Sequence, residues 1–161
     1  MTTDFERQRG WCEETRAVRG ATERSHFDET NEAIFLSSGY VYKSAEEAES
    51  AFKEEIDRYL YSRFGNPTVA MFERRLALLE GAEDCRAMAS GMAAVFAALA
   101  SGLNAGDRLV ASRALFGSCH YICSELLPRF GIETVLVDGT DMSEWKEALS
   151  KPANAVFLES P

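Results

Sequence analysis

The pattern of apolar and polar positions changes near residue 45. Residues 1–45 mix threonine, serine, glycine and charged residues, and their apolar positions show little regular spacing. We expect an extended N-terminal arm here, because such a segment has too little local core to fold by itself. Its partner would be the rest of the domain or another subunit. From residue 46 onward the apolar positions recur at helical spacing.

Two helices carry recognisable end signals. A capping-box spacing that begins at Ser44 predicts a helix over Ala45–Glu55. Farther along, Asn66 suits an N-cap position and Pro67 suits the first helical position. Gly81 is expected to end that second helix, whose apolar positions at i, i+4 and i+7 are Phe72, Leu76 and Leu79.

The second half of the chain predicts an α/β fold. Gly91–Ala100 is apolar on nearly all sides, so a buried helix is expected there. Short runs typical of strands then alternate with helical patterns, which implies βαβ units and a mostly parallel sheet. In such a sheet a ligand lies at the carboxyl ends of the strands. The expected strands are Arg108–Ser112, Thr134–Asp138 and Ala155–Glu159, and the expected helices between them are Ser118–Arg129 and Met142–Leu149.

Charge and apolar runs narrow the class of protein. The net charge is −9, and such a surface repels phosphate backbones, so we expect no nucleic-acid partner. The longest apolar run, Met92–Ala100, is too short to cross a membrane. The first residues contain no apolar signal segment. We therefore expect a cytoplasmic protein with no membrane partner, whose cysteines are reduced thiols.

Cys119, His120 and Cys123 raise the possibility of a metal site. A closed zinc site needs four ligands, and no second ligand pair occurs elsewhere in the sequence. The favoured interpretation is two small buried thiols on one helix face, and no metal is expected. The other histidine, His26, has no convincing nucleophile partner, so a histidine-based triad is disfavoured.

Ser90, Gly91 and Met92 stand where a loop meets the start of a helix. Backbone amides at such a position can hold a phosphate group, and a glycine lets the anion approach closely. Small residues at a helix start also serve close packing, which is the competing interpretation. The sequence contains neither a P-loop motif nor a dinucleotide-binding fingerprint.

Tyr61, Arg63 and Phe116 add groups that suit a phosphorylated planar ligand. In an extended segment Tyr61 and Arg63 would point the same way and reach one phosphate. The alternative is a solvent-facing pair. Phe116 follows a predicted strand closely and could stack on a planar ring, unless it belongs to the core. Together the features match a phosphorylated planar cofactor better than a dinucleotide.

Five strings resemble the Cys/Met-metabolism family of pyridoxal-phosphate enzymes. They are YSRFGNPT at 61–68, ASGMAA at 89–94, LESP at 158–161, TRAVRG at 15–20 and AGDRL at 105–109. They cover nearly the whole chain in the right order, and the YSRxxNPT string is highly specific. The resemblance implies the N-terminal portion of a fold type I, aminotransferase-like transferase. Residues 1–45 would be its arm, and residues 46–161 an incomplete domain binding pyridoxal 5'-phosphate.

Within the family, three segments most resemble the O-succinylhomoserine sulfhydrylases. These are Arg19-Gly20, residues 63–66 and residues 115–118. The resemblance implies γ-replacement, in which O-succinylhomoserine and sulfide give homocysteine and succinate for methionine biosynthesis. Phe116 stands where many relatives carry tyrosine, which agrees with this subgroup. Cystathionine γ-synthase, cystathionine γ-lyase and methionine γ-lyase remain alternatives, as does a non-catalytic interaction module of this fold.

The resemblance also implies roles and partners. Ser90 would open the cradle in which the amides of Gly91 and Met92 bind the cofactor phosphate. Tyr61 and Arg63 would reach the phosphate of a neighbouring subunit, in a homotetramer built from dimers with shared sites. The Phe116 ring would stack on the pyridine, and the substrates would be an O-acylhomoserine and sulfide.

The family's Schiff-base lysine has no match in this sequence. The four lysines, none of which fits the family's lysine motif, are Lys43, Lys53, Lys146 and Lys151. The catalytic lysine is expected beyond Pro161. We therefore expect this 161-residue chain to be an inactive fragment of an active parent enzyme.

Overall fold

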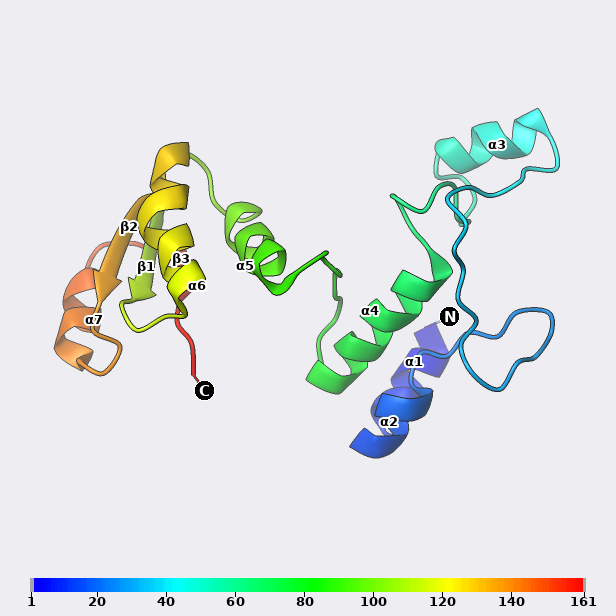
Figure 1. The fold of residues 1–161 in the computed structure, drawn as a ribbon, viewed down its shortest axis with the longest axis horizontal. Helices are drawn as coiled ribbons and strands as arrows, with labels where there is room; N and C mark the ends of the chain where they lie inside the picture. Colours follow the sequence, from blue (N-terminus) through cyan, green and yellow to red (C-terminus); the bar gives the residue numbers. More distant parts are fainter. Residues whose placement is uncertain (1, 161) are drawn as a thin grey trace. The chain divides into compact units, whose positions relative to one another are not determined.

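The computed structural model describes residues 2–160. These residues form two compact units, Met1–Ala87 and Met88–Pro161, each with its own elements (Figure 1). The first unit is helical and the second is α/β. No helix among the described residues is long and apolar enough to span a membrane.

The first unit begins with two short helices, α1 (Thr2–Arg9) and α2 (Glu13–Arg19). They replace the extended backbone predicted for this part of the arm. Contacts with later residues stabilise these helices: the Arg16 guanidinium donates to the carbonyl of Leu78 at 2.8 Å. The remainder of the arm up to residue 44 has no helix or regular strand, as predicted. Whether residues 46–161 make one cofactor-binding domain in the whole protein stays a prediction.

Local end signals fix the next two helices. Helix α3 (Ala45–Phe52) starts after Ser44, whose side chain accepts from the amide of Glu47. It ends three residues earlier than predicted, because the backbone turns left-handed at Glu54 (φ 60°). Helix α4 (Pro67–Glu80) has both predicted caps, with Asn66 bonded to Thr68 and Gly81 in the left-handed conformation (φ 66°).

The second unit contains a parallel sheet of three strands in the order β2-β1-β3. Strand β1 is Arg108–Ser112, β2 is Glu133–Val137 and β3 is Ala155–Phe157. The predicted parallel sheet is confirmed. Strand β2 begins one residue earlier than expected, and β3 stops two residues short of Glu159. Because β1 lies between β2 and β3, the chain reverses its direction of progress across the sheet at the β1–β3 boundary.

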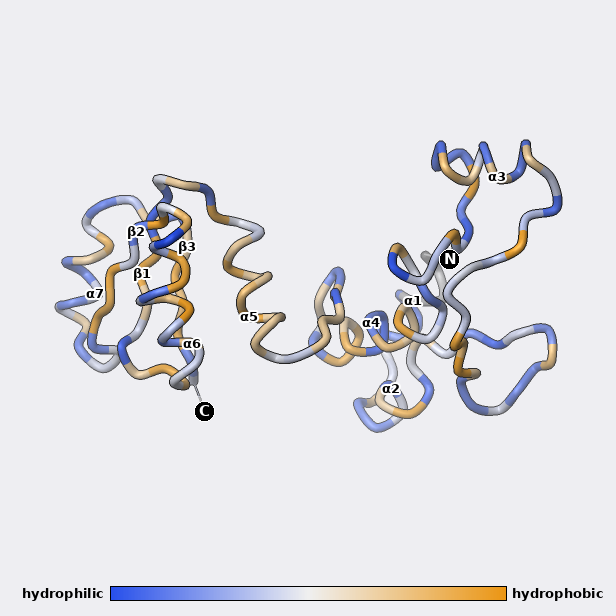
Figure 2. The backbone as a smooth tube through the Cα atoms, turned by 45° about the horizontal axis from the view of Figure 1, so that its top comes forward, coloured by the Kyte–Doolittle hydropathy of each residue, from blue (hydrophilic) through white to orange (hydrophobic). Residues whose placement is uncertain are grey.

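Helices cover both faces of this sheet. Alternate residues of β1 point to opposite faces. Leu109 and Ala111 join one core, while Val110 joins another beside Trp145. The first core is covered by α5 (Gly91–Ala100) and the helical segment after β1, and the second by α7 (Met142–Ala148). Figure 2 shows that α5 is hydrophobic along nearly its whole length.

Helix α5 is less buried in this chain than its composition predicts. Only Leu99 is buried, and Val95 and Phe96 are partly covered where they pack against the first core. The expectation of a buried helix is therefore wrong for most of its residues in this chain. One face of α5 meets the core, whereas Gly91, Ala94 and Ala98 are exposed within the described residues.

The helix predicted over Ser118–Arg129 is broken into three parts. An α-helix, α6 (Gly117–Tyr121), passes into a π-helical turn, η1 (Ile122–Leu126), and a 3₁₀ turn, η2 (Leu127–Phe130). Pro128 explains the change. It has no amide hydrogen for the carbonyl four residues back, and its ring crowds that carbonyl, so the α-helical bonding pattern cannot continue.

The four cysteines divide into two reactivity classes. Cys12 is exposed and Cys85 half-buried, whereas Cys119 and Cys123 are buried. Burial, with the nearby Glu159 carboxylate, raises the pKa of the Cys119 thiol. Burial, with nearby Cys119 and Glu159, raises the pKa of Cys123 to about 11. Both groups are therefore neutral thiols near neutral pH.

We expect only Cys12 and Cys85 to react quickly with a thiol-specific disulfide reagent at pH 8. Thiolate is the reacting form, and a pKa of about 11 leaves roughly one Cys123 in a thousand ionised at that pH. Peptide mapping after a brief exposure of the folded protein checks this. Equal labelling of all four in denaturant is the control. Rapid labelling of Cys123 in the folded protein would contradict the arrangement.

Candidate functional site

The start of α5 presents two unbonded amides. Ser90 is the N-cap, and its side chain accepts from the amide of Ala93 at 3.2 Å. Its carbonyl accepts from Ala94 at 3.0 Å. A helix start leaves four amides without intrahelical partners. Ala93 is one of these four, and the Ser90 side chain satisfies it. The amides of Gly91 and Met92 have no hydrogen-bond acceptor among residues 2–160.

Open space lies in front of Gly91. A Cβ added there would meet no atom within 4 Å, and the backbone is not left-handed at this position. Neither packing nor backbone conformation within this chain therefore requires a glycine. This weakens the packing interpretation of the small residues. The two amides and the space before them fit an anionic group at the helix start.

Phe116 presents its ring to solvent. The side chain is 64% exposed, so it is not a core residue of this chain. Phe116 is the N-cap of α6 and makes no side-chain capping bond. Its own amide donates to Oε2 of Glu159 at 2.7 Å. The ring is therefore available for stacking while its backbone is held.

Tyr61 and Arg63 share an exposed turn in the first unit. The amide of Phe64 donates to the carbonyl of Tyr61 at 2.8 Å, so the backbone turns here. The extended geometry considered for Tyr61 and Arg63 is therefore absent. The two side chains still lie together, because the Arg63 guanidinium carbon is 5.2 Å from the centroid of the Tyr61 ring and 5.0 Å from that of Phe64.

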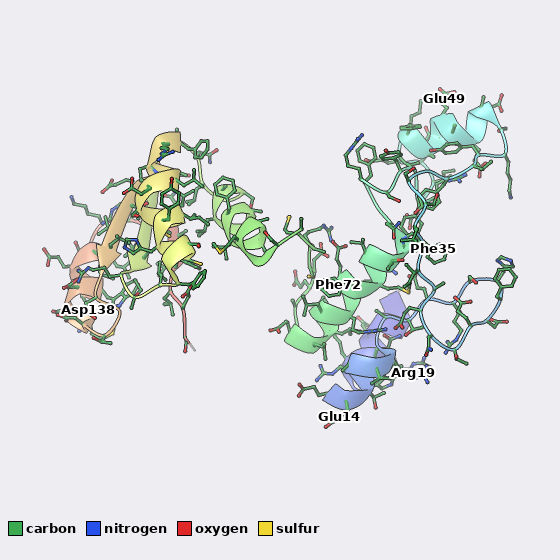
Figure 3. All side chains as sticks on the ribbon, viewed as in Figure 1. Glu14, Arg19, Phe35, Glu49, Phe72 and Asp138 are labelled. Atoms are coloured by element: carbon green, nitrogen blue, oxygen red, sulfur yellow. The ribbon has the colours of Figure 1, made fainter. Side chains whose placement is uncertain are left out.

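The arm holds this turn from the side. The Asn66 side-chain amide donates to the carbonyl of Phe35 and to the Ser62 hydroxyl, both at 3.0 Å. In return, the Phe35 amide donates to the Thr68 hydroxyl at 2.8 Å, which places Phe35 beside the start of α4 (Figure 3). The Ser62 amide donates to Ser38 at 2.9 Å. Residues of the arm thus fix the backbone that carries Tyr61 and Arg63.

The six predicted site residues fall in both compact units. Tyr61 and Arg63 belong to the first, whereas Ser90, Gly91, Met92 and Phe116 belong to the second. In the second unit, Met92 packs against the same core as Leu115, the residue before Phe116. The start of α5 and the turn after β1 are thus joined through one core.

The interpretation of Cys119 and Cys123 as buried thiols is supported by the structure. Among the described residues, no group of three potential ligands is placed to hold a metal ion. His120 lies next to the Ser124 hydroxyl, with Nδ1 at 3.4 Å from Oγ.

A comparison with family models decides the family. Residues 14–161 match the model described as Cys/Met metabolism PLP-dependent enzyme. This match covers more than half of the chain. The chain belongs to this family.

The chain is similar to two groups of curated members of this family. It is 59% identical to the O-succinylhomoserine sulfhydrylase of Mycobacterium tuberculosis strain H37Rv, over 94% of the chain and 37% of that protein. It is 35% identical to an L-methionine gamma-lyase of Fusobacterium nucleatum, over 91% of the chain and 37% of that protein. The chain therefore spans well under half the length of these relatives.

Solved structures agree on the fold. A Campylobacter jejuni protein assigned as an O-acetylhomoserine (thiol)-lyase, with N'-pyridoxyl-lysine-5'-monophosphate, gives a TM-score of 0.83 at 28% identity over 91% of this chain and 36% of its own. Cystathionine gamma-lyase from Lactobacillus plantarum gives 0.79 at 26% identity over 93% and 37%. The α/β fold of a pyridoxal-phosphate-dependent transferase is confirmed.

Pyridoxal phosphate is the cofactor of this family, and the second unit fits it. The unbonded amides of Gly91 and Met92 suit its phosphate, and the exposed Phe116 ring suits its planar pyridine. Lys146, one of the four lysines of the chain, lies on α7. This helix covers the face of the sheet opposite to the one that α5 packs against.

Sequence patterns place Glu159 at the end of a strand and Asn66 at a helix start, but they do not show the bond from Phe116 to Glu159 or those from Asn66 to Phe35 and Ser62. The bonds to Glu159 and Phe35 join residues far apart in the chain, which no local spacing reveals.

Proposed function

We propose that the whole protein is an O-succinylhomoserine sulfhydrylase. It would exchange the succinyl group on the γ-carbon of O-succinylhomoserine for sulfide and release homocysteine and succinate. The observation that carries the cofactor-binding part is the pair of unbonded amides at Gly91 and Met92. The 59% identity to a protein of this name favours this reaction over the others of the family.

The cradle would act on the cofactor phosphate. The amides of Gly91 and Met92 would donate to phosphate oxygens at the positive end of α5, where the Ser90 hydroxyl caps the same turn. The Phe116 ring would stack on the pyridine. When bound, the cofactor withdraws electrons from bonds at the substrate's α-carbon.

Tyr61 and Arg63 would complete the phosphate site from a neighbouring subunit. Arg63 brings a guanidinium that can bind two phosphate oxygens at once, and Tyr61 brings a hydroxyl. This arrangement requires dimers with shared sites, which we propose pair into a homotetramer. The substrates, an O-acylhomoserine and sulfide, are small molecules, and we propose a cytoplasmic location.

Substrate trials on the full-length protein test the reaction. We expect release of succinate from O-succinylhomoserine to depend on sulfide and to yield homocysteine. Release that depends on cysteine instead would identify a cystathionine γ-synthase. Methanethiol formed from methionine would favour the methionine γ-lyase alternative. The 35% identity to a protein of that name supports this alternative. Reactions without the sulfur donor are the control.

A further inference from the structure

We infer that Glu159 is a positioning residue for the Phe116 ring, because its carboxylate ties the turn after β1 to the end of β3. This inference rests on the stacking role proposed for Phe116. Glu159 itself would touch neither cofactor nor substrate. It would act by fixing the backbone from which the ring projects.

The first support is the bond to the Phe116 backbone. Oε2 of Glu159 accepts from the Phe116 amide at 2.7 Å, across 43 residues of sequence. As the N-cap, Phe116 has a side chain that cannot bond the first amides of α6. The carboxylate of Glu159, from the segment after β3, supplies an acceptor at this helix start. Bonds of this charge-assisted kind are short and roughly twice as strong as neutral ones.

The second support is the nearness of Glu159 to Cys119, one turn farther along α6. Cys119 is buried in the second unit, and the Glu159 carboxylate lies close enough to affect its thiol. Burial and the carboxylate both raise the pKa of this thiol, so it keeps its proton and can donate it. The Glu159 carboxylate thus lies beside the first turn of the helix as well as bonding the Phe116 amide.

The third support is the place of the contact in the sheet. Ala111 of β1 pairs with Phe157 of β3. Phe116 lies just past the carboxyl end of β1, and Glu159 lies two residues past the end of β3. The β1–β3 boundary is where the strand order reverses, and ligands in open α/β sheets bind beside such a reversal. Glu159 therefore links the segments that follow β1 and β3, at the carboxyl end of the sheet, where a ligand is expected.

Four variants of the full-length protein test the inference: Glu159→Ala, Glu159→Gln, Phe116→Ala and the double variant Glu159→Ala/Phe116→Ala. Two readouts that need no turnover are the dissociation constant for pyridoxal phosphate and the visible circular dichroism of the bound cofactor. We expect Glu159→Ala to raise the dissociation constant about 3- to 10-fold and to weaken the dichroism. Glu159→Gln keeps an oxygen acceptor, so it should stay within about 2-fold of the parent.

The double variant separates positioning from general damage. If Glu159 acts through the Phe116 ring, Glu159→Ala should add nothing to the loss caused by Phe116→Ala. Glu125→Gln, at an exposed glutamate of the same helical segment, is the charge-matched control and should change neither readout. Should Glu159→Ala fail to fold, Glu159→Asp replaces it, because its shorter side chain cannot span the same contact.

The outcomes distinguish the inference from the function on which it rests. A weakened Phe116→Ala with an unchanged Glu159→Ala overturns the positioning role and leaves stacking intact. Additive losses in the double variant also overturn it, because they show that Glu159 acts elsewhere. An unchanged Phe116→Ala overturns the stacking role itself and the inference with it.

Discussion

Replacing Arg63 by alanine is expected to lower the affinity of the full-length protein for pyridoxal phosphate by about 10- to 100-fold. Hydrogen bonds to charged groups contribute about 1.5–3 kcal/mol each, so the net loss of one such bond corresponds to about this range. In the structure Arg63 is exposed and lies over the rings of Tyr61 and Phe64. It forms no salt bridge within residues 2–160, so no carboxylate there competes for it.

Titration of cofactor into the cofactor-free variant measures this loss. Arg63→Lys should fall between the alanine variant and the parent, because lysine keeps the charge but cannot form the two-pronged contact. Arg86→Ala is the matched control. It removes the same charge from an exposed pair with Asp84 and should stay within about 2-fold. Equal affinity of Arg63→Ala and the parent would refute the phosphate clamp.

Asn66→Ala is expected to weaken the attachment of the arm by about 2–3 kcal/mol. Loss of an N-cap costs about 0.5–2 kcal/mol, and each lost buried hydrogen bond adds about 0.5–1.5 kcal/mol. The Asn66 side chain is nearly buried and serves both purposes. It accepts from Thr68 at 2.9 Å and donates to Phe35 and Ser62 at 3.0 Å.

Hydrogen exchange at the amides of Phe35 and Ser62 in the full-length protein reads out this attachment. Faster exchange by a factor of about 30 to 150 corresponds to the expected loss. Asn66→Asp separates the two contributions, since it keeps the cap acceptor but has no amide hydrogens to donate. It should show roughly half the effect. Unchanged exchange in Asn66→Ala would mean that other contacts hold the arm.

Features set by neighbouring residues could be predicted from the sequence. Asn66, Pro67 and Gly81 give the ends of α4 to the residue, because each acts on the backbone within one turn. The parallel sheet also follows from the alternation of apolar runs with helical patterns. Its central strand sends Val110 to one core and its two neighbours to the other, as a period of two requires.

Features that depend on distant contacts could not be predicted in this way. Helix α2 has no buried residue and no apolar stripe, and its Arg16 bonds to Leu78, 62 positions away. A charge signal was present, with glutamates in the first turn and arginines in the last, which suit a helix dipole. The π-helical turn before Pro128 was also missed, since helical spacing alone does not show how a proline distorts the preceding turn.

The candidate site also has features set by neighbouring residues and features set by distant contacts. Its residue types and order could be identified from local strings, and the α5 start has the expected capped geometry. The exposure of Phe116 and its hydrogen bond to Glu159 could not be predicted from local strings, because 43 positions separate the two residues. The bond from Phe64 that closes the turn at Tyr61 has no sequence signature, so the local spacing does not distinguish this turn from an extended geometry.

The donors at the start of α5 belong to the main chain, which has a consequence for sequence change at that spot. Met92 can be exchanged for many other amino acids without removing its N–H, whereas proline would delete the donor outright. If these amides bind an anion as proposed, divergent chains can keep the site while carrying different amino acids at that position. Two features must be kept: the backbone conformation at the start of the helix and the open space for a ligand beside Gly91.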